Sequence, residues 1–155
     1  MYPSTMRETS FIAFLAVVTS FSMLMACKKP QAAPVSERIA KVWTAQKVDE
    51  NSATVYTRGA TANVRNYSAF RLDLSAPPTV RYTDFDGATT TFTGQYSVPS
   101  DNRLVLTALT PVPTGTNGTI EFTIGNLSDN SVTLTRTTPS QKTGNSTNVY
   151  TLSNP

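Results

Sequence analysis

Apolar and polar residues alternate along most of the chain from about Lys41 onward. The clearest run is Thr119–Ile124, in which three large apolar residues share one side while threonine and glutamate take the other. Alternation with a period of two predicts β-strands that bury one face and expose the other. Abundant threonine on the polar side suits exposed strand positions, because it is β-branched and polar.

Similar runs, separated by clusters of Pro, Gly, Asn and Asp, predict eight or nine short strands. The predicted strands are Lys41–Val48, Ala53–Thr57, Phe70–Leu74, Val80–Thr83, Thr89–Val98, Arg103–Ala108, Thr119–Ile124, Ser131–Thr135 and Thr147–Leu152. Their regular spacing and short connections predict an all-β, antiparallel up-and-down meander that forms a barrel or a strongly curved sheet. The longer connection 58–68 is interpreted as a crossover, with a turn of helix or a lid over the barrel mouth as the alternatives.

The predicted inward face is bulky and aromatic. Its members are Phe70, Leu72, Tyr82, Phe92, Tyr96, Leu104, Leu106, Ile120, Phe122, Ile124 and Leu134. Eight short strands enclose just enough room for side chains or for one small molecule, so a filled core is favoured over a ligand cavity. Trp43 is expected in the core rather than in the wall of a ligand site.

The N-terminal part carries an uncharged apolar run, Phe11–Ala26. At about 1.5 Å per residue this run is short for a ~30 Å hydrocarbon core, and its length is typical of a signal peptide. It ends in Leu24-Met25-Ala26-Cys27, which resembles the lipobox of bacterial lipoproteins. That resemblance implies cleavage before Cys27 and a lipid on its thiol; a conventional secretory peptide cut elsewhere is the alternative.

The expected organisation is therefore a signal peptide at 1–26, a lipidated Cys27 with a flexible tether at 27–37, and a β domain at 38–155. Met1 and Met6 both remain possible starts. The lysines after Cys27 favour the periplasmic side of the outer membrane over the cell surface, because they do not resemble acidic surface-export signals.

Composition excludes several kinds of chemistry. There is no histidine, which removes histidine-based triads, histidine general bases and the common zinc sites. The net charge of +3 comes from scattered cations, so nucleic-acid binding is not expected. Asp84-x-Asp86-Gly87 lacks the further ligands of a calcium loop and suits a hairpin turn. No metal, cofactor, catalytic residue or ligand-binding residue is assigned.

Charged residues of the domain leave two further hypotheses. The carboxylates that a glycosidase-type pair would need fall mostly on turns or exposed strand faces, so an enzyme is not expected: Asp73, Asp84, Asp86, Asp101, Glu121 and Asp129. Arg71, Arg81, Arg103 and Glu121 either form one charged patch for a partner or are ordinary solubilising residues.

Five segments carry a family resemblance: Lys41-Val42-Trp43, Phe70–Leu74, Asp86-Gly87, Gly94-Gln95-Tyr96-Ser97 and Leu127–Leu134. Together with the lipobox, they make the chain similar to the small lipocalin-like lipoproteins of Bacteroidota. The resemblance spans roughly residues 38–137, with Lys41 and Tyr96 replacing the glycine and the second tryptophan of the family pattern. It implies an up-and-down barrel and, by analogy with lipocalins, a ligand; it carries no catalytic residue.

These observations predict a lipid-anchored binding domain of the cell envelope that is not an enzyme. Its target is a small hydrophobic ligand or another envelope component, and the membrane is contacted through the N-terminal lipid. The alternative is a structural or adhesive accessory lipoprotein whose filled barrel acts through protein partners.

Overall fold

The alternating segments form one antiparallel sheet in a computed structural model that describes residues 31–85 and 90–155. Within these residues the elements are α1 (Val35–Arg38), β1 (Val42–Glu50), β2 (Ala53–Thr57), β3 (Arg71–Ala76), β4 (Thr79–Thr83), β5 (Thr91–Ser100), β6 (Arg103–Thr110), β7 (Ile120–Gly125), β8 (Ser131–Arg136), η2 (Gln141–Thr143) and β9 (Asn148–Ser153). Every predicted strand is present, with bounds that differ by at most two residues at either end.

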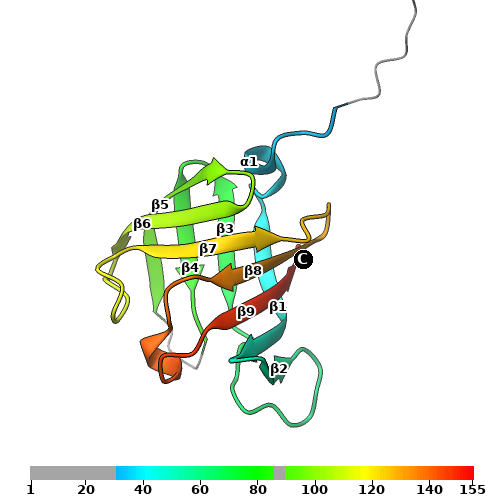
Figure 1. The fold of residues 1–155 in the computed structure, drawn as a ribbon, viewed down its shortest axis with the longest axis vertical. Helices are drawn as coiled ribbons and strands as arrows, with labels where there is room; N and C mark the ends of the chain where they lie inside the picture. The colour runs from blue at the N-terminus through cyan, green and yellow to red at the C-terminus, as the bar shows by residue number, and fades with distance from the viewer. Residues whose placement is uncertain (1–30, 86–89) are drawn as a thin grey trace, which may run out of the picture. The chain divides into compact units, whose positions relative to one another are not determined.

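The strands follow the order β2-β1-β3-β4-β5-β6-β7-β8-β9, and β1 also pairs with β9 (Figure 1). That last pairing runs from Thr44 to Glu50 on β1 and closes eight strands into a barrel. Consecutive strands from β3 to β9 are neighbours, so the predicted up-and-down meander is confirmed. The exception is β2, which lies outside the closed ring as a ninth strand.

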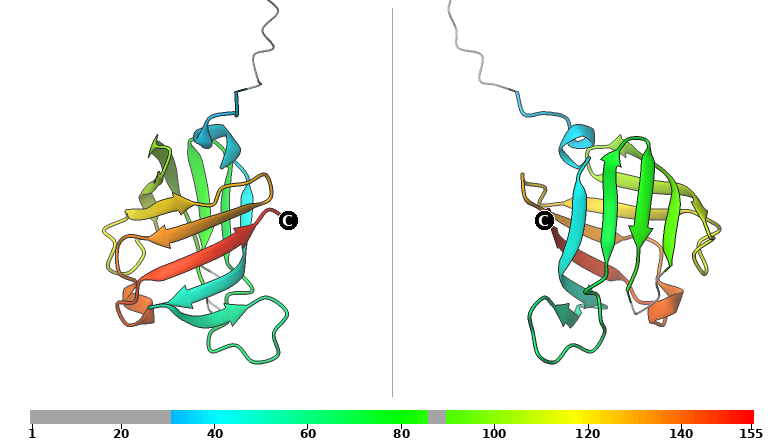
Figure 2. Two further views of the ribbon diagram at one scale, coloured as in Figure 1. Left: turned by 45° about the vertical axis from the view of Figure 1, so that its right-hand side comes forward. Right: turned by 180° about the vertical axis from the view of Figure 1, so that it is seen from behind.

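β1 changes its partner along its length. Val42–Thr44 pairs with β3, whereas Lys47–Glu50 pairs with β2. The crossover from β2 back to β3 runs around the end of the barrel opposite α1, at the lower edge of both views in Figure 2. The crossover contains turns and bends but no helix.

The crossover also covers the outer edge of β2. Val64 and Arg65 donate backbone hydrogen bonds to the carbonyl of Val55. The side-chain amide of Asn63 both accepts from Thr57 N–H, at 2.8 Å, and donates to the Thr57 carbonyl, at 3.1 Å. The ninth strand is therefore not left as an open template for another chain.

The barrel interior is aromatic, as predicted. All eleven residues of the predicted inward face are buried. Trp43 is fully buried and donates from Nε1 to the carbonyl of Ile39 at 2.9 Å, which places it in the core. Phe70 stacks on Tyr150 at 4.9 Å between ring centroids and meets Tyr82 edge-on at 5.7 Å.

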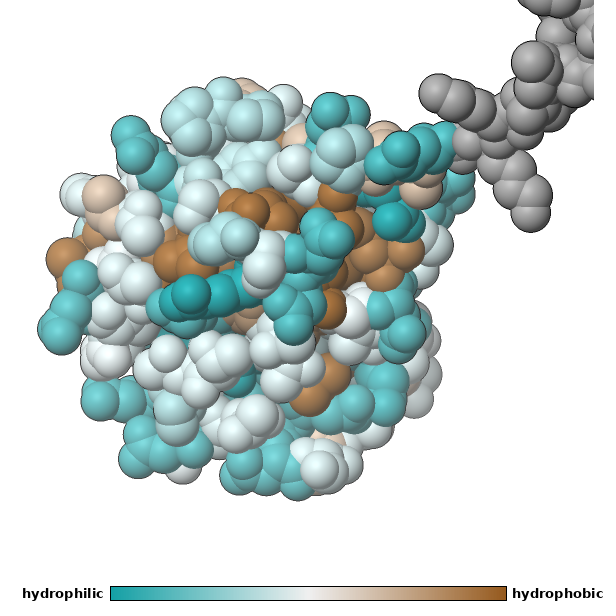
Figure 3. Space-filling view, turned by 45° about the horizontal axis from the view of Figure 1, so that its top comes forward, coloured by the Kyte–Doolittle hydropathy of each residue, from teal (hydrophilic) through white to brown (hydrophobic). Residues whose placement is uncertain are grey.

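At the α1 end the chain enters the compact unit Ala33–Pro155. Helix α1 lies in the segment for which an extended tether was expected, and half-buried Val35 packs on the core together with Val98 and Leu127. Figure 3 shows apolar surface on this side broken up by polar side chains. Because the unit has its own closed sheet and core, we expect it to fold without residues 1–32.

Gly94 is required by the approach of β5 to β6. A Cβ atom there would lie 2.5 Å from the carbonyl oxygen of Thr107, where β6 bulges and Ala108 has a φ of +52°. Gly125 on β7 provides a comparison, since the nearest atom to its Cβ position is the Thr133 carbonyl at an ordinary 3.8 Å.

We predict that Gly94→Ala lowers the free energy of unfolding by about 1–3 kcal/mol, because the added methyl group displaces the backbone of β6. Gly125→Ala is expected to change it by less than about 0.5 kcal/mol. Urea unfolding followed by tryptophan fluorescence measures both variants. Equal effects of the two substitutions would contradict the close approach of β5 and β6.

Candidate functional site

Polar side chains occupy the inward face of the barrel at the end opposite α1, which is called here the polar end. On β8 the inward positions are Val132, Leu134 and then Arg136. On β4 they are Val80 and Tyr82, followed directly by Asp84. Period-two alternation that places apolar residues inside along these strands therefore places an arginine and an aspartate inside at their ends.

One hydrogen-bond network holds most of this end together. Glu50, 8% exposed, accepts from Arg65 Nε at 2.9 Å and from the Tyr67 hydroxyl at 2.8 Å. Asn148 donates to the hydroxyls of Tyr67, at 3.4 Å, and Tyr150, at 3.1 Å. The buried charge of Glu50 is thus neutralised and hydrogen-bonded, as a buried carboxylate requires.

The network continues into η2. Ser146 donates to the side-chain carbonyl of Asn148 at 2.6 Å, and the Thr143 and Ser146 hydroxyls are hydrogen-bonded to each other. Thr143 also donates to the backbone of Ser140 at 3.1 Å. These buried hydroxyls anchor η2 against the end of β9.

Arg136 and Tyr82 lie beside this network, and a hydrogen bond from Arg136 acts to lower the pKa of Tyr150. Arg136 is 3% exposed, and its Nε has no hydrogen-bond partner. The Tyr82 side chain is fully buried, and its hydroxyl has no hydrogen-bond partner either. Across residues 31–85 and 90–155, no carboxylate forms an ion pair with Arg136.

Asp84 is close enough to Arg136 for the arginine charge to act on its pKa, but its buried environment disfavours ionisation. Burial raises the pKa of the Asp84 carboxyl, and this outweighs the opposing effects of the Phe85 N–H, Arg136, the Tyr82 hydroxyl and Lys142. Burial also raises the pKa of Tyr82 well above its ordinary value. Tyr82 is therefore a protonated hydroxyl, available as a hydrogen-bond donor.

Lys142 adds a second cation beside the polar end. It belongs to η2, and its ammonium group lies 5.9 Å from the centre of the Phe92 ring. Its charge also acts to lower the pKa of Asp84.

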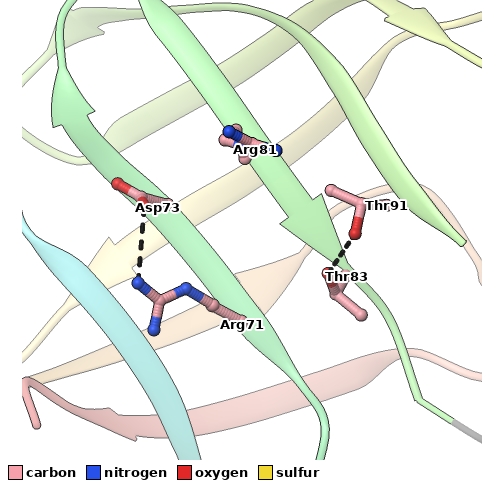
Figure 4. A pocket seen from close by; sticks show the side chains of 5 residues that line it. All are labelled: Arg71, Asp73, Arg81, Thr83 and Thr91. Atoms are coloured by element: carbon pink, nitrogen blue, oxygen red, sulfur yellow. Dashed lines mark hydrogen bonds and ion pairs between the residues drawn. The ribbon is translucent and has the colours of Figure 1, made fainter. Parts of the chain in front are cut away.

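A second candidate is a depression on the outer face of β3, β4 and β5, with a volume of about 290 Å³, lined by Arg71, Asp73, Arg81, Thr83 and Thr91 (Figure 4). Arg71 pairs with Asp73 at 3.5 Å, and the Thr83 and Thr91 hydroxyls are hydrogen-bonded at 3.1 Å. Since most of its polar groups already have partners, the depression is the weaker candidate.

The charged residues singled out in the sequence fall into two groups. Arg71 and Arg81 lie on β3 and β4, whereas Arg103 pairs with Glu121 across β6 and β7 at 2.8 Å, with β5 between the groups. Asp84 corrects the interpretation of the carboxylates as solvated, because it is 8% exposed and points inward at the end of β4.

Some predicted features lie outside the described residues. Cys27 and the lipobox are among them, as are Asp86 and Gly87 of the hairpin turn. In the part of the chain that is described, no three acidic or cysteine side chains are grouped to hold a metal ion. No helix in residues 31–85 or 90–155 is long and apolar enough to cross a membrane.

The sequence patterns did not identify three residues of this site: Arg136, Glu50 and Asn148. For Arg136 a signal existed, because the alternation of Ser131–Thr135 continues by one inward step to residue 136.

Comparison of the chain with family models, with curated proteins and with solved structures gave no match. The site is therefore defined by its geometry alone.

The raised pKa of Asp84 predicts how stability depends on pH. At pH 3 the Asp84 carboxyl is mostly neutral in both the folded and the unfolded chain. Above about pH 4 it ionises more readily in the unfolded chain. The folded state therefore loses stability as the pH rises, until the pKa of Asp84 in the folded state is passed. Asp84→Asn removes this loss and keeps an oxygen that accepts from Phe85 N–H. We expect the melting-temperature difference, variant minus wild type, to increase between pH 3 and pH 7.

Asp73→Asn is the matched control with the opposite sign. Hydrogen bonds from Ser75, ahead of the Arg71 charge, lower the pKa of Asp73, so its stabilisation is present above the unfolded pKa and is lost as the pH falls. The melting temperature of Asp73→Asn minus that of the wild type should therefore decrease from pH 3 to pH 7. A decrease for Asp84→Asn as well would contradict the disfavoured ionisation of Asp84.

Proposed function

We propose that this chain is a lipid-anchored binding domain of the bacterial cell envelope, and that its barrel binds a small molecule at the polar end rather than catalysing a reaction. Cys27 carries the lipid, the segment after it is the tether, and the outer membrane is the location, on the periplasmic side. The resemblance to small lipocalin-like lipoproteins agrees with this role and names no ligand.

The observation that carries the proposal is the buried arginine at the polar end. A barrel that served only as a scaffold would be most stable with apolar side chains there, because burying a charge costs several kcal/mol unless it is well paired. Here the Nε atom of Arg136 and the Tyr82 hydroxyl are buried without hydrogen-bond partners. Groups left in this state require an explanation, and a bound ligand would supply one.

Two features favour the alternative role as a scaffold for protein partners. The aromatic rings of the interior pack closely against each other, and the large apolar side chains that are exposed in residues 31–85 and 90–155 lie in loops, Val64 at 78% and Val112 at 64%. Partner binding by strand addition is disfavoured because Asn63 and Val64 cover the edge of β2.

The anchor is tested with Cys27→Ser in the native host. Loss of the thiol is expected to abolish acyl labelling and to release the protein from the membrane fraction, because two or three acyl chains hold a protein essentially permanently. Ser22→Ala in the same segment is the control and should behave as wild type. Unchanged labelling of Cys27→Ser would contradict lipidation.

Ligand binding is tested by native mass spectrometry of residues 28–155, which contain the compact unit Ala33–Pro155. We expect gently purified protein to carry an additional mass that disappears on denaturation. A bare protein mass that stays unchanged in a panel of amphiphilic small molecules would contradict the proposal and favour the scaffold role.

A further inference from the structure

Arg136 is a buried cation whose Nε has no hydrogen-bond partner and which forms no ion pair with a carboxylate of the described residues. It is the last residue of β8 and lies opposite Phe122 of β7 in the sheet, so its side chain is inside the barrel close to the rim. It is 3% exposed, which keeps water from solvating its charge. A guanidinium in this setting is strongly attracted to any anion that can reach it.

The groups around Arg136 do not supply that anion. Glu50 is already engaged by Arg65 and Tyr67. Asp84 is held toward its neutral form by burial, and Lys142 adds positive charge on the same side. Among the described residues, no carboxylate of the polar end forms an ion pair with Arg136.

The hydroxyl of Tyr82 supplies a hydrogen-bond donor in the same cluster. The charges of Arg136 and Asp84 both act on the pKa of Tyr82, as does a long hydrogen-bonding interaction with the Asp84 carboxyl, but no acceptor lies at full hydrogen-bond geometry from the Tyr82 hydroxyl. A buried donor without an acceptor is destabilising. A negatively charged acceptor would satisfy both the Tyr82 hydroxyl and the Arg136 Nε.

We propose that the polar end binds the carboxylate group of a small organic acid, with Arg136 as its charge partner and the Tyr82 hydroxyl as a hydrogen-bond donor. A carboxylate fits because its two oxygens match the planar fork of a guanidinium and accept from a hydroxyl as well. Arg136 and Tyr82 are thus assigned as ligand-binding residues. The inference rests on the proposed binding function and names the chemistry of its ligand.

The surroundings favour an acid with an apolar part. Tyr82 contacts the ring of Phe92 at 5.9 Å between centroids, and Phe122 contacts Tyr150 at 6.1 Å. A carbon chain next to the carboxylate would therefore meet aromatic rings rather than water. A short acid has the same carboxylate without an apolar carbon chain. The probes must therefore distinguish short acids from acids with an apolar part.

The test is isothermal titration calorimetry of residues 28–155 with sodium octanoate, 1-octanol and sodium acetate. We expect octanoate to bind at least tenfold more tightly than 1-octanol, which has the same chain length and no charge. Acetate binding as tightly as octanoate, with the same dependence on Arg136, would support the site and assign it to a short acid.

Four variants locate the binding energy. Arg136→Gln should weaken octanoate binding at least tenfold, whereas Arg103→Gln, which removes an equal charge from the outer face, should change it by less than twofold. Tyr82→Phe should weaken binding severalfold with little effect on folding, because its hydroxyl has no partner in the free protein. Asp84→Asn should leave octanoate binding within about twofold of wild type, because burial already holds the Asp84 carboxyl toward its neutral form.

Three results would overturn the inference: equal binding of octanoate and 1-octanol, equal loss in Arg136→Gln and Arg103→Gln, or no binding of octanoate and acetate. If native mass spectrometry nevertheless shows a bound molecule, the proposed function stands and the carboxylate site alone is wrong. If the protein is bare in that experiment as well, both fail. Tyr82→Phe keeps the test decisive if Arg136→Gln does not fold.

Discussion

Pairing of β1 with β9 is the interaction on which the rest of the structure depends. It runs from Thr44 to Glu50 and joins the first strand of the domain to the last, so the sheet has no open edge within its eight-stranded ring. In a closed ring every second residue of every strand faces inward. Closure therefore determines the interior along the whole length of each strand, including its final residues.

The two ends of the barrel use this constraint differently. Near α1 the inward side chains are apolar, and the indole N–H of Trp43 is satisfied by the carbonyl of Ile39. At the polar end, β1 leaves β3 for β2, and Tyr67 of the crossover contacts both Tyr56 and Tyr150. The inward positions there are occupied by groups that form hydrogen bonds or carry charge, and two of their atoms, Arg136 Nε and the Tyr82 hydroxyl, have no hydrogen-bond partner.

Most of the fold was predictable because alternation is a local signal. Thr119–Ile124 and Ser131–Thr135 identify their own strands, and short connections place consecutive strands side by side. The position of β2 was not predictable, because it depends on a change of partner in the middle of β1 that no local pattern marks. The unpaired state of Arg136 depends on which residues seven other strands bring to the same end.

Asp84 shows the same limit for the site. Its neighbours in the sequence, Tyr82 and Phe85, are buried, yet an aspartate before a predicted Asp-Gly turn is normally solvated. The alternation of inward and outward side chains places Asp84 inside the barrel only if the extended strand conformation continues past Thr83. Sequence patterns alone do not determine such a boundary, and the electrostatics of the polar end depend on it.

The central claim is that the fold buries the Arg136 guanidinium with no hydrogen-bond partner for its Nε, and that a carboxylate ligand supplies one. The Nε–H group of Arg136, followed by NMR in ¹⁵N-labelled protein, tests this directly. The claim predicts that its proton exchanges far more slowly than those of exposed arginines such as Arg71, and that its resonance moves downfield as octanoate is added. Fast exchange, or a resonance that octanoate leaves unchanged, would contradict it.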